Sequence, residues 1–100
     1  MDVVAFVDDL MDRSRITAAV SGVRFARAPD AAGAADVAIV DLARHAAVVR
    51  ALRAGNVELR IVGFGPHVDG DVAQAAHADG ADLVLPRSRF FHDVAAALTL

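Results

Sequence analysis

Short apolar runs recur along the chain, and the polar stretches between them carry apolar residues at helical spacing. Five such runs predict strands, and they cover residues 3–7, 23–26, 37–40, 59–64 and 82–86. The runs at 3–7 and 37–40 are continuously apolar, which is typical of central strands covered on both faces. The run at 23–26 alternates, with Arg24 and Phe25 on opposite faces, which favours an edge strand.

Helices are predicted between and after these strands. The first runs from an Asp12 N-cap to about Val20, the second covers 43–54, the third runs from about Asp69 to Gly80, and the last starts at a Ser88 N-cap. The residues expected to face the sheet are Ile16, Ala19, Val20, Val48, Val49, Leu52, Phe91, Val94, Ala95 and Leu98. The segment 27–36 contains Pro29 and Gly33, and it leaves room for at most one short helical turn.

The alternation of strands and helices predicts an α/β fold with a single domain over residues 1–100. Right-handed crossovers give a flavodoxin-like, doubly wound parallel sheet of five strands in the order 2-1-3-4-5, with a reduced or missing second helix. The loss of that helix is expected to uncover apolar surface beside the second and third strands. A homodimer or another binding surface is therefore predicted there.

Composition excludes several classes of function. No apolar run approaches the ~18 residues that span a bilayer, so we expect a cytoplasmic protein without a membrane partner. The chain has no cysteine, and all ten of its basic residues are arginine, which excludes thiol chemistry and catalysis by a lysine side chain. A net charge of −3 gives no basic footprint for nucleic acid.

Acidic residues follow two of the predicted strands. Asp8 and Asp9 follow the first strand, Asp41 follows the third, and Arg87 follows the fifth. In a doubly wound sheet the carboxyl ends of the strands form the usual ligand site, so these side chains are expected to converge. Two interpretations remain open: the acids bind a cation, or they lie in solvated loops and cap the helices that follow.

Three stretches resemble the receiver domain of CheY-type response regulators. "VAFVDDLMDRSRI" resembles its first strand and acidic turn, "VAIVDL" its third strand, and "IVGFGPHVDGDVAQAAHADGADLVLPRS" the region from the fourth strand through the fifth. The whole pattern is closest to an atypical, stand-alone, pseudo-receiver-like bacterial subgroup. The resemblance implies two-component signalling without enzymatic activity, and a histidine kinase or partner regulator as the partner.

The resemblance also implies roles for individual residues. Asp8, Asp9 and Asp41 would bind Mg²⁺ together with the backbone carbonyl of Ala43. Asp41 would in addition accept a phosphoryl group from a phosphohistidine donor. Hard oxygen ligands suit Mg²⁺, and phosphoryl transfer needs mainly positioning and charge neutralisation.

Departures from the receiver pattern concern the phosphate side of the site. Gly65 stands where receivers carry a hydroxyl residue, and Pro66 after it lacks a backbone N–H. Arg87 stands in place of the counter-charge lysine, and its planar fork differs from an ammonium in reach and geometry. We expect Arg87 and Arg89, which flank Ser88, to form salt bridges with Asp41 and Asp9.

Three functions remain as alternatives. The leading one is a stand-alone receiver-like signalling module that acts through protein contacts, with impaired phosphorylation at Asp41. The second is a pseudo-receiver whose conformation is set by partner binding alone. The third is a small α/β module that binds an anionic metabolite through the "GFGPH" loop and Arg87.

Overall fold

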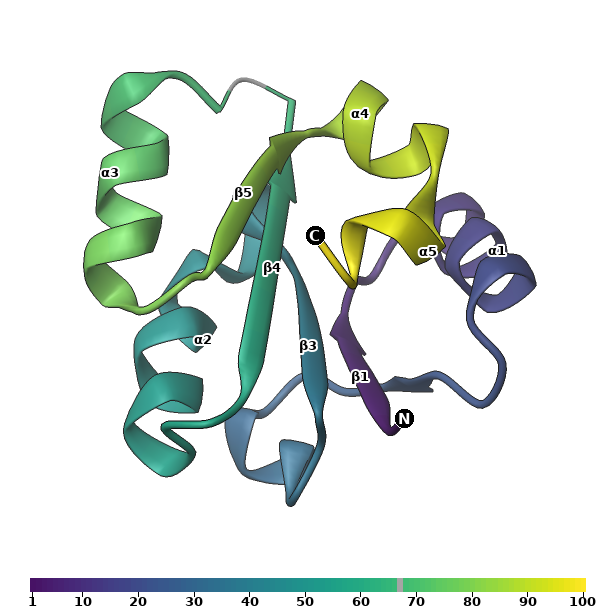
Figure 1. Cartoon of the computed structure of the whole chain (residues 1–100), viewed down its shortest axis with the longest axis horizontal. Helices are drawn as coiled ribbons and strands as arrows, with labels where there is room; N and C mark the ends of the chain where they lie inside the picture. The colour runs from purple at the N-terminus through teal and green to yellow at the C-terminus, as the bar shows by residue number, and fades with distance from the viewer. Residues whose placement is uncertain (67) are drawn as a thin grey trace.

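The computed structural model describes residues 1–66 and 68–100, and it alternates strands with helices along the chain (Figure 1). In chain order the elements are β1 (Val3–Phe6), α1 (Leu10–Ala19), β2 (Arg24–Phe25), the 3₁₀ turn η1 (Pro29–Ala32), β3 (Val37–Asp41), α2 (Leu42–Gly55), β4 (Arg60–Gly65), α3 (Gly70–Asp79), β5 (Leu83–Pro86), α4 (Arg87–His92) and α5 (Val94–Ala97). All strand pairs are parallel and the order is β2-β1-β3-β4-β5, which confirms the predicted topology. No helix among the described residues is long and apolar enough to cross a membrane.

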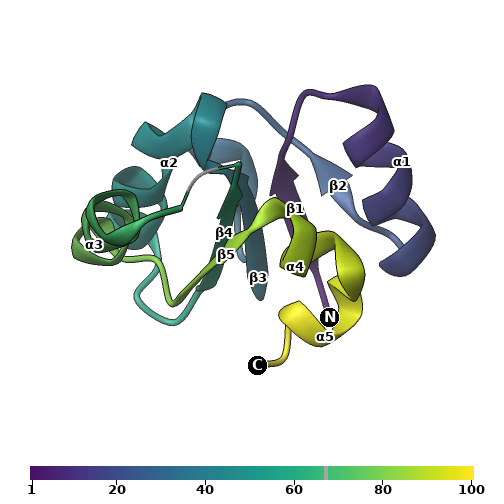
Figure 2. The same ribbon diagram turned by 90° about the horizontal axis from the view of Figure 1, so that it is seen from above.

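Helices cover both faces of the sheet, with α1, α4 and α5 on one side and α2 and α3 on the other (Figure 2). Side chains alternate between the faces along each strand, so β1 places Val3 and Ala5 against one layer and Val4 and Phe6 against the other. Both faces of the central strands are buried, which explains why these strands appear in the sequence as continuous apolar runs.

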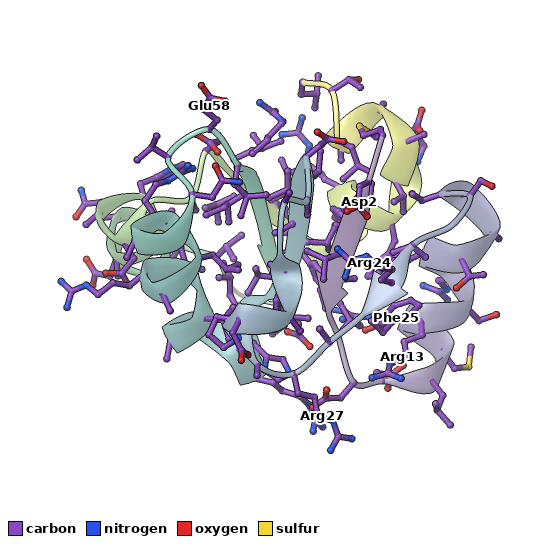
Figure 3. All side chains as sticks on the ribbon, turned by 90° about the horizontal axis from the view of Figure 1, so that it is seen from below. Asp2, Arg13, Arg24, Phe25, Arg27 and Glu58 are labelled. Carbon is purple, nitrogen blue, oxygen red and sulfur yellow. The ribbon has the colours of Figure 1, made fainter. Side chains whose placement is uncertain are left out.

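The predicted reduced helix is the single turn η1. Arg24 of β2 holds this turn, because its guanidinium donates to the carbonyls of Ala31 at 3.0 Å and Ala32 at 3.1 Å. The same guanidinium pairs with Asp2 at 3.1 Å, and the two side chains lie together in Figure 3. A hydrogen-bonded arginine therefore fixes a segment that is too short to form a regular helix.

The sheet face beside β2 and β3 is covered, contrary to expectation. Val4 and Ala38 on that face are completely buried, and Ala32 and Ala35 of the short segment pack into the same cluster. Small alanines let the 3₁₀ turn approach the sheet closely enough to replace a helix. The predicted bare apolar face is therefore wrong, and the homodimer that rested on it stays a prediction.

The start of α1 also differs from expectation. Asp9, and not Asp12, is the N-cap, and its carboxylate accepts a hydrogen bond from the backbone N–H of Asp12 at 2.9 Å. Asp12 lies in the first turn of the helix, and Asp12, Ile16 and Val20 follow one another at intervals of four residues and are all buried. This inward stripe is narrow, so Ala19 beside it is exposed and its predicted burial is wrong.

The last predicted helix is split in two. β5 runs to Pro86 and α4 starts at the next residue, so Ser88 lies inside the first turn and does not cap it. Asp93 then breaks the helix with a non-helical backbone, and its carboxylate caps α5 by accepting a hydrogen bond from the N–H of Ala96 at 3.0 Å. The buried positions of this segment are Phe90, Val94, Ala97 and Leu98, whereas Ala95 is exposed.

Candidate functional site

The three predicted acids lie at one edge of the sheet. β1 and β3 are hydrogen-bonded neighbours, and Phe6 pairs with Val40. Asp41 ends β3 at this level, and Asp8 and Asp9 follow β1 there. The parallel topology therefore brings the carboxylates to the edge where doubly wound sheets bind ligands.

Asp41 is a buried helix cap. Its side chain is at the end of β3, the residue is only 5% exposed, and Oδ1 accepts a hydrogen bond from the backbone N–H of Ala43 at 3.1 Å. β3 passes into α2 without an intervening loop, because Leu42 is already helical. The interpretation of Asp41 as an N-cap is confirmed, and its role as a phosphoacceptor stays a prediction.

Asp8 faces a histidine that the sequence analysis did not assign to the site. Asp8 Oδ1 lies 3.1 Å from His45 Nε2 and 4.0 Å from the Nε of Arg27. The first distance suits an ion pair, but the two groups lack hydrogen-bond alignment, and neither atom has a hydrogen-bond partner among the described residues. The pKa of Asp8 is lowered, mainly because His45 contacts it, and the positive charge of Arg27 adds to the effect.

His45 reaches Asp8 because α2 is irregular at this residue. Its backbone has φ −127° and ψ 25°, outside the helical range, and its side chain is 14% exposed. Helical spacing alone places His45 on the solvent face of α2, so its approach to the acidic edge follows from the kink.

Arg87 pairs with Asp12, and Arg89 forms no salt bridge among the described residues, so the predicted salt bridges to Asp41 and Asp9 are wrong. The Nη1 and Nη2 of Arg87 donate to the two carboxylate oxygens of Asp12 at 2.9 and 2.7 Å. The reason is that Asp12 lies on the inward face of α1, where its side chain is buried and meets the start of α4. The pKa of Arg87 is raised, first by this hydrogen bond and at longer range by the charges of Asp41 and Asp9.

Aromatic rings surround the Asp12–Arg87 pair. The guanidinium carbon of Arg87 lies 5.1 Å from the ring centre of Phe91 and 5.6 Å from that of Phe64. Phe64 in turn stacks on Phe90 with ring centres 4.7 Å apart. The rings stabilise the cation through their π faces.

Gly65 and Pro66 do not share a cavity with Arg87, although Gly65 pairs with Pro86, the residue directly before Arg87. They line an apolar hollow of about 170 Å³ whose other walls are Leu42, Ala43, Val68 and Val72. Arg87 lines a different hollow, together with Arg15, Ser88, Phe91 and His92. The predicted group of Gly65, Pro66 and Arg87 is therefore not assembled around one cavity, and His67 lies outside the described residues.

Each acid of the predicted Mg²⁺ site has another partner within the chain. Asp8 faces His45, Asp9 caps α1, and Asp41 caps α2 through the N–H of Ala43. Across the described parts of the chain, no group of three or more acidic or histidine side chains is placed to hold a metal ion. Mg²⁺ also prefers oxygen ligands to the histidine nitrogen that faces Asp8. Mg²⁺ binding through these acids and the Ala43 carbonyl stays a prediction.

Comparison with known proteins gives a match in structure only. No protein-family model matches the sequence, and no curated protein does. A response regulator from Thermotoga maritima matches 100% of this chain and 99% of its own, with 15% sequence identity and a TM-score of 0.75. The phosphorylated cyanobacterial phytochrome response regulator RcpA matches 95% of this chain and 89% of its own, with 14% identity and a TM-score of 0.75.

A third similar structure is a response regulator from Burkholderia pseudomallei that contains a phosphorylated aspartic acid. It matches 96% of this chain with 21% identity and a TM-score of 0.76, and the match spans 64% of that longer chain. The predicted resemblance is thus confirmed at the level of the fold. The chain has the fold of a response-regulator receiver domain.

Proposed function

We propose that this chain is a non-enzymatic, receiver-like module of bacterial two-component signalling that acts through contacts with other signalling proteins. The observation that carries the proposal is the internal pairing of charges at the acidic edge, on a receiver fold. Asp12 occupies both terminal nitrogens of Arg87, and His45 faces Asp8. Groups that would otherwise meet a phosphoryl group already have partners inside the chain.

Phosphorylation of Asp41 is the weaker part of the proposal. The position of Asp41 at the end of β3 supports phosphorylation. The charge of Asp41 also helps to raise the pKa of Arg87, which indicates that the two groups interact. Gly65 opposes phosphorylation, because a residue without a hydroxyl cannot hydrogen-bond a phosphoryl group through its side chain. We therefore propose slow phosphorylation that has little effect on the conformation.

Two exposed apolar side chains support a role in protein contacts. Leu10 and Met11 are adjacent at the start of α1, and they are 79% and 66% exposed. They directly follow Asp9, so they lie beside the acidic edge. Methionine adapts its shape to different surfaces and is common at sites that bind other proteins.

The anionic-metabolite alternative is not favoured. It required the "GFGPH" loop and Arg87 to act on one ligand, but the described loop residues Gly65 and Pro66 line a separate, apolar hollow. Arg87 is also paired with the carboxylate of Asp12, which makes its guanidinium less available to a bound anion.

Two measurements test the proposed function. Intact mass after incubation with acetyl phosphate and Mg²⁺ is expected to show a small adduct of one phosphoryl group, absent from Asp41→Asn. Affinity capture from a lysate of the source organism, followed by peptide sequencing, is expected to return a histidine kinase or a response regulator. Capture of neither would contradict signalling through protein contacts, and rapid stoichiometric labelling would contradict impaired phosphorylation.

A further inference from the structure

Asp12 is a buried acid that does not cap α1, contrary to its predicted role. Its side chain is 4% exposed, and both of its oxygens accept hydrogen bonds from Arg87. Burial of a carboxylate is costly unless a cation compensates it, so the position of Asp12 depends on Arg87. Arg87 is less dependent on Asp12, because its side chain is 37% exposed and can be hydrated.

The pair joins two elements that are distant in the sequence. Asp12 lies in the first turn of α1 and Arg87 is the first residue of α4, a separation of 75 residues. Figure 2 shows α1 and α4 on the same side of the sheet. The two-pronged hydrogen bond therefore holds the start of α4 against α1 next to the acidic edge.

The same guanidinium lies near the end of β3: its carbon is 5.6 Å from the ring centre of Phe64, and Phe64 is the residue of β4 that pairs with Asp41. The charge of Asp41 accordingly contributes to the raised pKa of Arg87. A carboxylate carries one negative charge, whereas a phosphoryl group carries about two and has three acceptor oxygens. A guanidinium presents a rigid fork, and while both terminal nitrogens are bound to Asp12 it cannot present this fork to a second anion. Asp12 and an anion on Asp41 therefore compete for Arg87.

We propose that Asp12 makes an autoinhibitory contact: it withholds Arg87 from Asp41 and thereby suppresses phosphorylation of that residue. The inference rests on the proposed function of the acidic edge and explains why phosphorylation there is impaired. In the reaction, a carboxylate oxygen of Asp41 attacks the phosphorus of a phosphodonor such as acetyl phosphate. The new O–P bond forms as the bond to the leaving oxygen breaks, acetate departs with the electron pair, and no proton is transferred. Arg87 released from Asp12 would neutralise charge on the phosphoryl oxygens.

The test compares the rate of phosphoryl labelling by acetyl phosphate, followed by intact mass, among matched variants. Asp12→Asn keeps the shape of the side chain and removes its charge, and labelling is expected to rise about tenfold, the effect of one hydrogen bond to a charged group. Arg87→Lys gives a second route, because lysine keeps a cation beside Asp12 but loses the fork. It is expected to raise labelling as well.

Three controls separate the contact from other effects. Asp12→Asn combined with Arg87→Met is expected to label at or below the wild-type rate, because the released cation is absent. Asp79→Asn disrupts the surface pair with Arg50, whose atoms are 3.6 Å apart, and is expected to leave labelling unchanged. Asp41→Asn combined with Asp12→Asn is expected to remove the adduct.

Hydrogen exchange of residues 87–92 supplies a readout without phosphorylation. Release of Arg87 is expected to speed exchange there in Asp12→Asn and not in Asp79→Asn. Unchanged labelling in both Asp12→Asn and Arg87→Lys would overturn the proposal, even with faster exchange, since the pair would then be structural only. A labelling gain without capture of a signalling protein would support the autoinhibitory contact and contradict the proposed function, so the two failures are distinguishable.

Discussion

Asp12 and Arg87 share one salt bridge but differ in their exposure to water. Asp12 is 3% exposed as a residue, whereas the Arg87 side chain is 37% exposed. Removal of the cation leaves an uncompensated charge in the interior, whereas removal of the acid leaves a cation that water can reach. The energetic consequences of the two removals are therefore unequal.

We predict that Arg87→Met destabilises the protein more than Asp12→Asn does. Loss of the cation is expected to cost about 2 kcal/mol, below the usual value for a fully buried pair because Arg87 is partly hydrated. Loss of the acid is expected to cost less than about 1 kcal/mol. Urea unfolding at neutral pH measures both, with Arg50→Met at the exposed pair with Asp79 as the control. Equal losses for the two variants would contradict the unequal burial.

The contact between Asp8 and His45 predicts a dependence of stability on acidic pH. The pKa of Asp8 in the folded protein is lowered from 3.8. A lowered folded-state pKa contributes stability that is fully present above the unfolded-state pKa and is lost as the pH falls through the folded-state pKa. We therefore expect the wild type to lose stability below about pH 3.8 more steeply than His45→Gln does.

Urea midpoints measured at several pH values between 5 and 2.5 test this difference. His92→Gln on α4 is the matched control, since its exposed side chain has no contact with Asp8 in the described structure. Wild-type and His45→Gln midpoints that fall in parallel would show that His45 does not lower the pKa of Asp8.

At the residue scale, the sequence predicted which acids share an edge but not their partners. Asp8, Asp9 and Asp41 could be placed because they follow predicted parallel strands. Asp12 could have been recognised by its spacing of four from Ile16, which indicates the inward face of α1. Its partner could not, because contact across 75 residues depends on how α1 and α4 pack.

At the scale of elements, the end of α3 is the most restrictive junction. Gly80 is its C-cap with φ +118°, a left-handed conformation that favours glycine. The guanidinium of Arg53 donates to the Gly80 carbonyl at 2.8 Å, and a Cβ added at Gly80 would lie 2.7 Å from Arg53 Cβ. Close approach of an arginine and the backbone conformation both require glycine here.

We predict that Gly80→Ala destabilises the protein by about 2 kcal/mol, because it combines left-handed backbone strain with overlap on Arg53. Gly55→Ala is the matched control, since Gly55 is helical and an added Cβ meets no atom within 4 Å. That change is expected to be neutral or to stabilise by about 0.5 kcal/mol. Thermal unfolding measures both variants, and a neutral Gly80→Ala would contradict the restriction at this junction.

Strands could be predicted better than helix ends for a physical reason. Buried strands need apolar side chains on both faces, and that requirement is visible as a run of residues. Helix ends depend on which of several capping residues the chain geometry selects. The N-cap of α1 is Asp9 and not Asp12. Helix α4 has no side-chain cap, because it follows Pro86 directly.

At the scale of the whole molecule, exposed apolar side chains indicate where a partner binds. The large exposed apolar side chains of the described residues are spread over several elements, and they are Met1, Leu10, Met11, Val57, Val72 and Leu100. Leu10 and Met11 are adjacent to each other and to the acidic edge, at the carboxyl ends of the strands. Val57 lies in the loop between α2 and β4, at the opposite end of the strands, and is 82% exposed.

We predict that Leu10→Ser combined with Met11→Ser reduces binding of the captured signalling partner at least tenfold, because two side chains that bury apolar area at an interface each contribute about 1 kcal/mol or more. Urea unfolding of this variant is expected to match the wild type within about 0.5 kcal/mol, since both side chains are exposed. Val57→Ser removes a similarly exposed apolar side chain at the other end of the molecule, and it is expected to leave binding unchanged. Titration calorimetry with the purified partner measures all three proteins. Sedimentation velocity of the chain alone, before and after the double change, determines whether a second copy occupies the same surface. Equal losses of binding in the Val57 variant and the double variant would show that the partner does not recognise the start of α1.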